Sequence, residues 1–376
     1  MWNHKYLLRI DYRIVVAILF LMGISLLVIS SMTADVSNNE VVFFTSPVKS
    51  QIERFIIGWI VFLFFAGFDY RKFSKYSHIL YLVMVLVLLG LYLTQPIQRV
   101  HRWYRIPFIN FSIQPSEFAK IVVVISLAAL LEGKEKIAHR WSVILQIMAI
   151  VGIPFFLILK QPDLGSALVL YPITLVMGYL AGINKKIINV LSLSGLIGIV
   201  FVSLMFTNVL THEKMRPFFT SFLKEYQYER LNPNTYHQKA SQTSISIGGL
   251  TGCGWHKGEF AGKKFLPMAH TDSVFAAFGE EFGFIGIVFL LFLFYGLIYF
   301  SFQVSSMAKD RFGKLLSSGV AVYLSMHIII NIAMMIGFLP ISGVPLILIT
   351  YGGSSVMITM AALGILQSIY SRRFMF

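Results

Sequence analysis

Long apolar runs separated by polar segments recur ten times along this chain of 376 residues. A helix needs about 20 mostly apolar residues to cross the hydrocarbon core of a bilayer. We therefore predict an all-α polytopic membrane protein with about ten transmembrane helices, organised as a single integral membrane domain over residues 1–376. The predicted spans lie near 14–32, 54–68, 78–94, 115–132, 142–159, 164–182, 187–206, 272–301, 315–338 and 346–370.

Composition supports a membrane protein and excludes several other classes. The chain is 57% hydrophobic and 13% charged, with a mean hydropathy of +0.75, whereas soluble domains carry about 25% charged residues. Its net charge is +14, but the basic residues lie between spans rather than in one domain, so we predict no nucleic-acid partner. A single cysteine, Cys253, excludes an intrachain disulfide framework.

The distribution of lysine and arginine gives the orientation. Short cytoplasmic connections are enriched in these residues. They occur in the N-terminal arm, in every second connection and in the tail, so we predict that both termini are cytoplasmic. The long segment between spans 7 and 8, about 207–271, is then a large extracytoplasmic loop. The residues that decide this are Lys5, Arg9, Arg13, Arg71, Lys72, Lys75, Lys134, Lys136, Arg140, Lys185, Lys186, Lys309, Arg311, Lys314, Arg372 and Arg373.

Basic residues also occur on the predicted outer side. They favour either an anionic ligand or anionic lipid headgroups, and charge alone does not separate these two interpretations. One group surrounds Trp103, and the other is in the long loop, where aromatic residues predict an amphipathic surface helix. The basic residues are Arg99, Arg102, Arg105, Lys214, Arg216, Lys224, Arg230, Lys239, Lys257, Lys263 and Lys264; the aromatic ones are Phe218, Phe219, Phe222, Tyr226, Tyr228 and Trp255. The glycine-rich stretch Ser244–Gly254 is more typical of tight turns than of a phosphate-binding loop.

Acidic residues inside apolar spans are the main candidates for chemistry. Asp272 opens the eighth predicted span, and Glu280 and Glu281 follow within it. Charges in a membrane span are costly and usually functional. The alternatives are that Asp272 caps the helix and that the glutamates pair with a lysine or arginine elsewhere. The spacing of Gly279 and Gly283 favours close helix packing.

All even-numbered predicted spans begin on the outer side, so their positive helix ends should converge there, and four of these starts carry polar or turn residues. Capping explains Glu117 and Asp163 at the starts of spans 4 and 6 better than catalysis does. Lys120 is a cation near a helix N-terminus and needs a partner, either Glu117 or an anionic substrate. The tenth span contains paired glycines before Ser354 and Ser355, which fit either a kink or unwound backbone lining a polar cavity.

Familiar soluble catalytic motifs are absent from the sequence. It contains no HExxH pair, no Walker loop and no GxSxG elbow. Any reaction must therefore be driven by its own substrate, at the outer face.

Several long motifs, in one order along nearly the whole chain, resemble the SEDS family (shape, elongation, division and sporulation). Within this family the chain resembles the rod-shape branch, RodA, more than the division branch, FtsW, because of the sequence at Ser342–Leu346. The motifs are RWYRI at Arg102–Ile106, QPSEFAK at Gln114–Lys120, QPDLGSALV at Gln161–Val169, IGGLTGCG at Ile247–Gly254, LPMAHTDSVFAAFGEEFGFIG at Leu266–Gly286 and GFLPISGVPLILITYGGSS at Gly337–Ser355.

The resemblance implies a glycosyltransferase in the bacterial inner membrane that polymerises lipid II, the undecaprenyl-diphosphate-linked disaccharide pentapeptide, on the periplasmic face. It implies that Asp272 is the catalytic residue and Trp103 is important, with Lys120 and Asp163 lining or supporting the cavity. We add Arg102, Glu117, Gln161, Glu280, Ser354 and Ser355 as substrate-binding candidates. Implied partners are a class B penicillin-binding transpeptidase and the elongation machinery.

The sequence departs from the family pattern near the predicted site. Met268 stands in place of a glutamate and Ser273 in place of a phenylalanine, while Ser246 and Ile247 replace a glycine and a serine; the glycine that usually precedes RW is also absent. Asp272 is intact, so the catalytic prediction is kept.

The implied reaction is an inverting displacement at an anomeric carbon. It needs a base, for which Asp272 is the candidate, and positive charge near the leaving diphosphate. A divalent cation, Mg²⁺ or Mn²⁺, could share that second task, and no organic cofactor is expected. Trp103 could stack on a sugar or anchor at the interface. The alternatives are a lipid II flippase, a division-specific polymerase, and a scaffold that recruits a transpeptidase.

Overall fold

The computed structural model describes residues 2–34, 43–94, 101–106, 111–134, 137–206, 209–210, 212–220, 228, 232, 234–263 and 265–374. Among these, ten helices have 18 residues or more, and each corresponds to one predicted span. They are α1 (Tyr12–Thr33), α2 (Ser46–Gly67), α3 (Arg71–Gly90), α4 (Pro115–Glu132), α5 (Trp141–Lys160), α6 (Leu164–Ala181), α7 (Lys185–Phe206), α12 (Val274–Met307), α13 (Arg311–Ile336) and α14 (Gly353–Ser371). Short 3-10 helices occupy His4–Arg9 and Leu91–Leu93.

Nine of these helices are long and apolar enough to cross a membrane, counted over the described part of the chain. The tenth, α4, carries Glu117, Lys120 and Glu132 within its 18 residues, and these charges lower its apolar character. The chain is therefore an all-helical, multi-pass membrane protein, as the hydrophobic pattern predicts. Several helices extend past the predicted spans, because polar first turns such as that of α2 continue the helix outside the apolar run.

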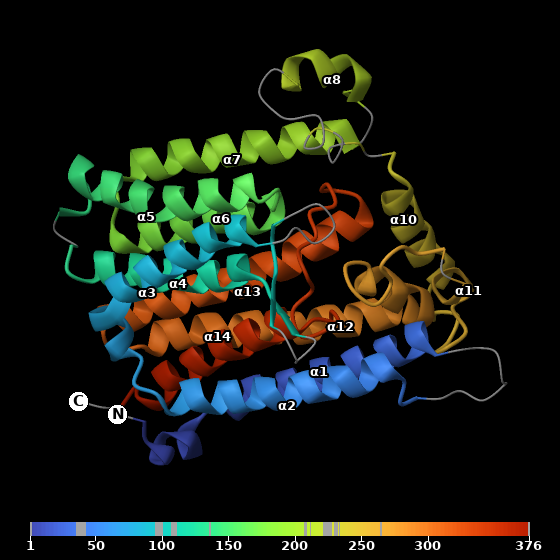
Figure 1. Ribbon diagram of the computed structural model, residues 1–376, viewed down its shortest axis with the longest axis horizontal. Helices are drawn as coiled ribbons and strands as arrows, with labels where there is room; N and C mark the ends of the chain where they lie inside the picture. Colours follow the sequence, from blue (N-terminus) through green and yellow to red (C-terminus); the bar gives the residue numbers. More distant parts are fainter. Residues whose placement is uncertain are drawn as a thin grey trace.

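Both termini lie at one end of the helix bundle, and α10 (Tyr236–Gly248) and α11 (Glu259–Gly262) lie at the other (Figure 1). The terminal segments are joined by hydrogen bonds. The backbone N–H of Asp11 donates to Gln367 Oε1 at 2.7 Å, and Arg372 donates to the carbonyl of Gly67 at 2.8 Å. This arrangement agrees with an even number of spans.

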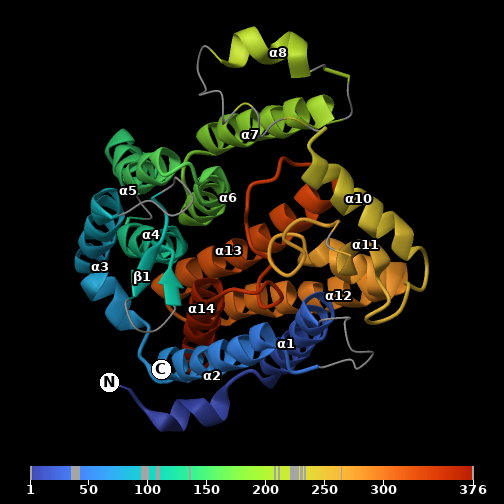
Figure 2. The ribbon, with the colours of Figure 1, turned by 45° about the vertical axis from the view of Figure 1, so that its right-hand side comes forward.

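Helices α13 and α14 form the centre of the bundle, and α7 lies at its edge (Figure 2). Most of α14 is buried, whereas almost all of α7 is exposed. Small residues allow α14 to approach α2 closely, since a Cβ added at Gly364 would lie 2.6 Å from the carbonyl oxygen of Phe62. The elements that carry the polar motifs therefore rest on a tightly packed pair of helices.

A small hairpin follows α3 and was not predicted from the sequence. Strand β1 (Tyr104–Ile106) pairs antiparallel with β2 (Phe111–Ile113), with Tyr104 opposite Ile113. The hydroxyl of Tyr104 donates to the carbonyl of Val87 at 2.8 Å, which holds the hairpin against the end of α3. The hairpin begins directly after Trp103, and Arg102 donates to the carbonyl of Gln161, close to the start of α6.

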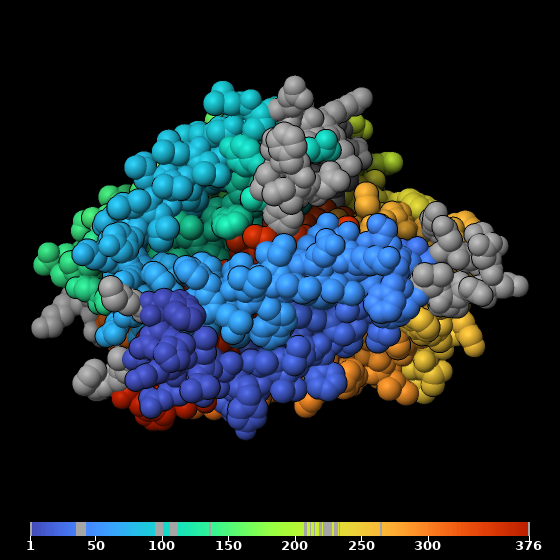
Figure 3. Space-filling view, turned by 60° about the horizontal axis from the view of Figure 1, so that its bottom comes forward, coloured from blue at the N-terminus to red at the C-terminus, as the bar shows by residue number. Residues whose placement is uncertain are grey.

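The final span begins at Gly353 rather than at 346, which corrects the predicted boundary. Helix α13 ends at Gly337, whose φ of 93° lies in the left-handed region. Pro340 and Pro345 cannot continue a helix, and the segment 338–352 is irregular although much of it is buried. Of the two alternatives for this span, the structure shows the unwound backbone, while the polar cavity that it was expected to line stays a prediction. The space-filling view shows red atoms of the C-terminal part of the chain between α2 and the α3–α4 side (Figure 3).

Helix α12 also differs from the predicted span 272–301, because it begins at Val274 and is interrupted at Gly283, which has φ 63° and ψ −165°. The loop before it fills the break. The carbonyls of Glu280 and Glu281 accept from the N–H groups of Cys253 and Gly254, and the N–H groups of Phe284 and Ile285 donate to the carbonyls of Gly249 and Leu250. Four backbone groups at the break are thus paired by the loop, which a low-dielectric environment favours.

The long loop contains α8 (His212–Phe219), α10 and α11. Helix α10 packs against α12 and α13 and belongs to the folded body. Gly252 and Gly254 adopt positive φ in the turns that reach the α12 break, so turn chemistry explains this stretch. Arg99, Lys136, Lys224, Arg230, Lys264, Phe222 and Tyr226, and the side chains of Lys214, Phe218 and Phe219, lie outside the described residues.

Candidate functional site

Asp272 lies in the turn that leads into α12 and is half-buried. The turn is closed by backbone bonds from Thr271 and Ser273 to the carbonyl of Met268, at 3.0 and 3.2 Å. The side-chain amide of Asn331 in α13 donates to the backbone carbonyl of Asp272 at 3.3 Å and to that of Val344 at 2.8 Å. One side chain therefore fixes the Asp272 backbone and the irregular 338–352 segment relative to each other.

The 338–352 segment also forms hydrogen bonds to the residues before Asp272. Thr350 donates its hydroxyl to the carbonyl of Thr271 at 3.3 Å, and the N–H of Tyr351 donates to the carbonyl of His270 at 3.0 Å. Gly343, with φ 72°, faces the aspartate closely: a Cβ there would lie 3.8 Å from Asp272 Oδ2. The turn is thus held by hydrogen bonds to its own backbone carbonyls, from side chains and from the backbone.

The Asp272 carboxylate has an unusual electrostatic setting. Burial raises its pKa above the ordinary value, the nearby Arg102 lowers it, and Asp163 raises it further. Among the described residues, no group donates a hydrogen bond to this carboxylate. Its oxygens are therefore available to accept a proton from a bound molecule.

Arg102 is held beside the site by the chain that enters α6. Its Nε donates to the carbonyl of Gln161 at 2.8 Å, and the Gln161 side chain donates to the carbonyl of Leu88 at 3.0 Å. Gln161 therefore joins α3 and α6 and supports Arg102 through its backbone. Trp103 follows Arg102 immediately and is half-buried.

Asp163 joins the starts of α4 and α6. Its Oδ1 accepts from the N–H of Ser166 at 3.3 Å, so the predicted capping role is confirmed. Its Oδ2 accepts from the Gln114 side chain at 2.8 Å and from the Ser116 hydroxyl at 2.9 Å. The starts of α4 and α6 therefore converge, as predicted. The charge of Asp163 also acts on the carboxylate of Asp272.

Lys120 is fully buried and its partner is Glu117, at 2.7 Å. Its ammonium also lies 2.7 Å from His327 Nε2. Because an ammonium group only donates, His327 accepts at Nε2 and carries its proton on Nδ1, which points to the carbonyl of Pro345 at 3.4 Å. This polar cluster links α4, α13 and the 338–352 segment.

Glu280 and Glu281 are buried and hold the long loop. Glu280 accepts from the N–H groups of Phe260 and Ala261, at 2.7 and 2.9 Å, and from the hydroxyl of Ser244 at 2.9 Å. Glu281 accepts from the N–H of His256 at 3.0 Å and from the hydroxyl of Ser31. In the described part of the chain neither glutamate pairs with a lysine or arginine, so the alternative of a buried ion pair finds no support there.

The close approach of the loop to α12 yields a stability prediction. A Cβ at Gly252 would overlap the carbonyl of Glu281, and the position has φ 81°. We expect Gly252→Ala to lower the melting temperature in detergent. The loss in free energy of unfolding should be at least the roughly 1–2 kcal/mol that a left-handed conformation costs a residue other than glycine. Gly254→Ala is the matched control, because φ is 97° there but only the Lys257 side chain lies nearby, at 3.4 Å. Equal melting temperatures for the two variants would contradict the steric explanation.

Ser354 and Ser355 lie in the first turn of α14 and are almost fully buried. Next to them the guanidinium of Arg54 in α2 stacks on the Tyr351 ring, 4.0 Å from its centroid, and that ring meets His270 edge-on at 5.7 Å. The sequence analysis missed Arg54, His327 and Asn331. The last two are polar residues in an apolar span, which is the signal that singled out Asp272.

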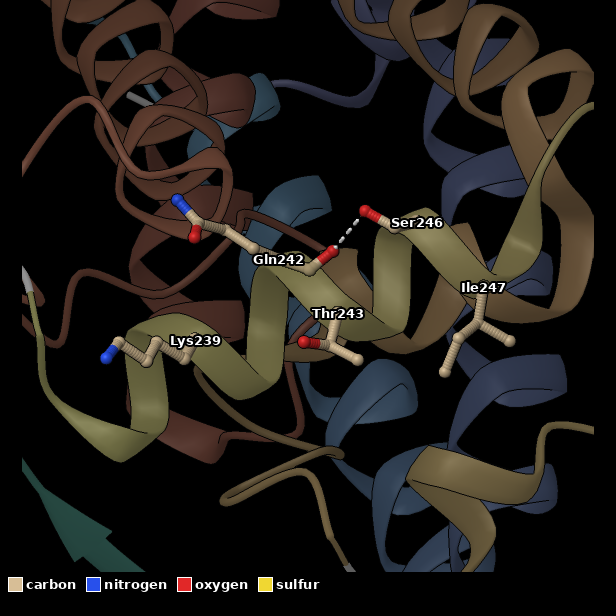
Figure 4. A pocket seen from close by; sticks show the side chains of 5 residues that line it. All are labelled: Lys239, Gln242, Thr243, Ser246 and Ile247. Atoms are coloured by element: carbon tan, nitrogen blue, oxygen red, sulfur yellow. Dashed lines mark hydrogen bonds between the residues drawn. The ribbon is translucent and has the colours of Figure 1, made fainter. Parts of the chain in front are cut away.

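The described residues contain no group of three histidine, cysteine, aspartate or glutamate side chains placed to hold a metal ion. Asp163, whose negative charge acts on the Asp272 carboxylate, already accepts three hydrogen bonds. The donor set thus does not form a metal cage, and Mg²⁺ or Mn²⁺ stays a prediction. A groove of about 510 Å³ lies elsewhere, along the exposed face of α10, and is lined by Lys239, Gln242, Thr243, Ser246 and Ile247 (Figure 4).

Comparison with known proteins identifies the family. The family model described as “Cell cycle protein”, which covers FtsW, RodA and SpoVE, matches residues 10–373. The chain belongs to the SEDS family of peptidoglycan glycosyltransferases. The SEDS protein is 32% identical to the peptidoglycan glycosyltransferase MrdB of Helicobacter pylori over 332 residues, covering 86% of this chain and 81% of the relative.

A second relative comes from the other branch. The probable peptidoglycan glycosyltransferase FtsW of Bacillus subtilis is 31% identical over 379 residues, covering 97% of the SEDS protein and 91% of the relative. Identity therefore does not separate elongation from division. A chain in a solved peptidoglycan synthase complex that coordinates polymerization and crosslinking superposes with a TM-score of 0.74 at 23% identity, covering 98% and 99% of the two chains, and shows the same fold.

Proposed function

We propose that this SEDS protein polymerises lipid II into glycan strands on the periplasmic face of the bacterial inner membrane, with Asp272 as the general base. The observation that carries the proposal is the half-buried Asp272 carboxylate, which lies beside Arg102 and accepts no hydrogen bond from the described residues. It is held at the end of the bundle where α4, α6, α12 and the 338–352 segment meet.

In the proposed step the hydroxyl oxygen of an acceptor sugar forms a bond to the anomeric carbon of the donor. The bond from that carbon to the lipid diphosphate breaks, with inversion, and the hydroxyl proton passes to Asp272. Arg102 and the basic residues of the long loop stabilise the charge on the leaving diphosphate. Lys120 acts indirectly, because its ammonium is buried against Glu117.

We further propose that the protein serves cell-wall elongation and acts with a class B transpeptidase, with both termini in the cytoplasm. The residues Ser342–Leu346, which resemble the rod-shape branch, support the elongation role. The structural likeness to a chain of a peptidoglycan synthase complex supports the partner. The division role is the alternative. Loss of rod shape in a depleted strain would support elongation, and loss of septation would support division.

The test is to mix the purified protein with lipid II, with and without its cognate transpeptidase, and to separate the products by length. Glycan polymer supports the proposal. Movement of lipid II across vesicles without any polymer would favour the flippase. No observation of the structure favours that alternative, since Glu280, Glu281 and Lys120 each have local partners.

The electrostatics at Asp272 predict how polymerisation depends on pH. A base must be ionised, so activity should rise with pH through the raised pKa of Asp272. Arg102 lowers that pKa, and Arg102→Gln should therefore shift the acidic limb of the kcat/KM profile to higher pH. Arg105→Gln is the control, since Arg105 is exposed in the same hairpin. A limb that stays in place or moves to lower pH in Arg102→Gln would argue against Asp272 as the titrating base.

A further inference from the structure

Helix α10 connects the two segments that enclose Asp272. On one side, Gln238 donates its side-chain N–H to the carbonyl of Met334 at 2.7 Å, and Gln242 donates to that of Ile336 at 3.2 Å. These are among the last carbonyls of α13, which have no partner within their own helix. Helix α10 is therefore anchored where the 338–352 segment begins.

On its other side α10 reaches the turn that carries Asp272. Nε2 of His237 lies 2.6 Å from the hydroxyl oxygen of Ser273. That hydroxyl also lies 2.8 Å from the carbonyl of Pro267. A carbonyl can only accept, so the single hydroxyl hydrogen goes to Pro267, and Ser273 accepts from a protonated Nε2 of His237.

This chain of two hydrogen bonds spans the turn. Pro267 lies at its start and Ser273 at its end, directly after Asp272. Ser273 is fully buried, so water does not replace a lost bond there. Its side chain makes no cap bond to α12, because the hydroxyl is already engaged. His237 is partly buried and its pKa is lowered by burial, which keeps the ring neutral at ordinary pH.

We propose that His237 is a positioning residue for the transfer reaction, holding the Asp272 turn in its reactive geometry through Ser273. The inference rests on the proposed role of Asp272 as the base. A base displaced by about 1 Å can lose about 100-fold in rate. Ser273 stands where the family resemblance expects phenylalanine, which has no oxygen to accept this bond.

The experiment compares His237→Leu, which removes the donor, with His237→Gln, whose side-chain Nε2 can restore it. Thr243→Ala is the control, on the exposed face of the same helix. Each purified protein is assayed with lipid II for kcat and KM, and amide hydrogen exchange is followed in a peptide covering 267–273. Melting temperatures report whether each variant is folded.

We expect His237→Leu to lower kcat by about tenfold with little change in KM, since the turn loosens while substrate contacts stay. Exchange in 267–273 should accelerate, and both effects should be reversed in His237→Gln and absent in Thr243→Ala. Ser273→Ala should reproduce the loss, and combining it with His237→Leu should add nothing further.

Other outcomes overturn the inference or the function separately. Wild-type kcat and exchange in His237→Leu, or equal defects in the Leu and Gln variants, would remove the positioning role while leaving Asp272 untouched. Undiminished polymer from Asp272→Asn would remove the proposed base. If the wild type makes no polymer, the proposed function fails, and the exchange comparison still decides whether His237 holds the turn.

Discussion

Asparagine in place of Asp272 should abolish glycan polymerisation, with kcat falling by about 10²–10⁴, the usual contribution of a general base. The substitution keeps the shape of the side chain and removes its ability to take a proton. The turn should survive, because its closing bonds come from the backbones of Thr271 and Ser273 and from Asn331. Polymer length and initial rate with lipid II, in the presence of the transpeptidase, give the measurement.

Glu259→Gln is the matched control for this result. It also removes a carboxylate from the same end of the molecule, but Glu259 is exposed and pairs with Lys263 at the surface, a pair that contributes little. The control should polymerise as the wild type does. A folded Asp272→Asn protein that retains comparable activity would assign the base to another group.

Lys120→Met should be the most destabilising single substitution, at about 3–5 kcal/mol, because it leaves a buried carboxylate without its cation. Glu117 is almost completely buried, and Lys120 is its ion-pair partner at 2.7 Å. His327 would lose its donor at Nε2 as well. A large fall in the melting temperature in detergent is the expected observation.

The double variant Glu117→Gln with Lys120→Met separates lost charge balance from lost packing. Removing both charges takes away the unpaired carboxylate, so much of the stability should return. If the double variant melts below the single one, the ion pair is not the source of the effect. A single variant as stable as the wild type would mean that the pair contributes nothing.

The apolar pattern was sufficient to predict the ten helices, and the cost of charge in a membrane span singled out Asp272, Glu280 and Glu281 as candidates. Spacing also identified the right partners in two places. Glu117 and Lys120 are three residues apart on one helix and pair, and Asp163 precedes the first helical residue and caps it. These are local relationships, which a sequence displays directly.

The remaining features depend on contacts between distant segments. The interruption of α12 at Gly283 is stable only because the 249–254 backbone supplies its missing partners. Likewise, the hairpin depends on Tyr104 reaching Val87. The hydrophobic periodicity of the sequence predicts neither of these contacts. Asn331 is a different case, because a lone amide in an apolar helix was visible in the sequence and its partners, Asp272 and Val344, were not.

The paired break in α12 has a consequence for biosynthesis. The 249–254 segment precedes α12 in the chain and so leaves the ribosome first. Inserted into lipid alone, the stretch around Gly283 would carry two bare carbonyls and two bare N–H groups, each costing several kcal/mol. The preceding segment must therefore already lie against this helix when the break forms. The final shape of the eighth span is in this sense templated by the chain that precedes it.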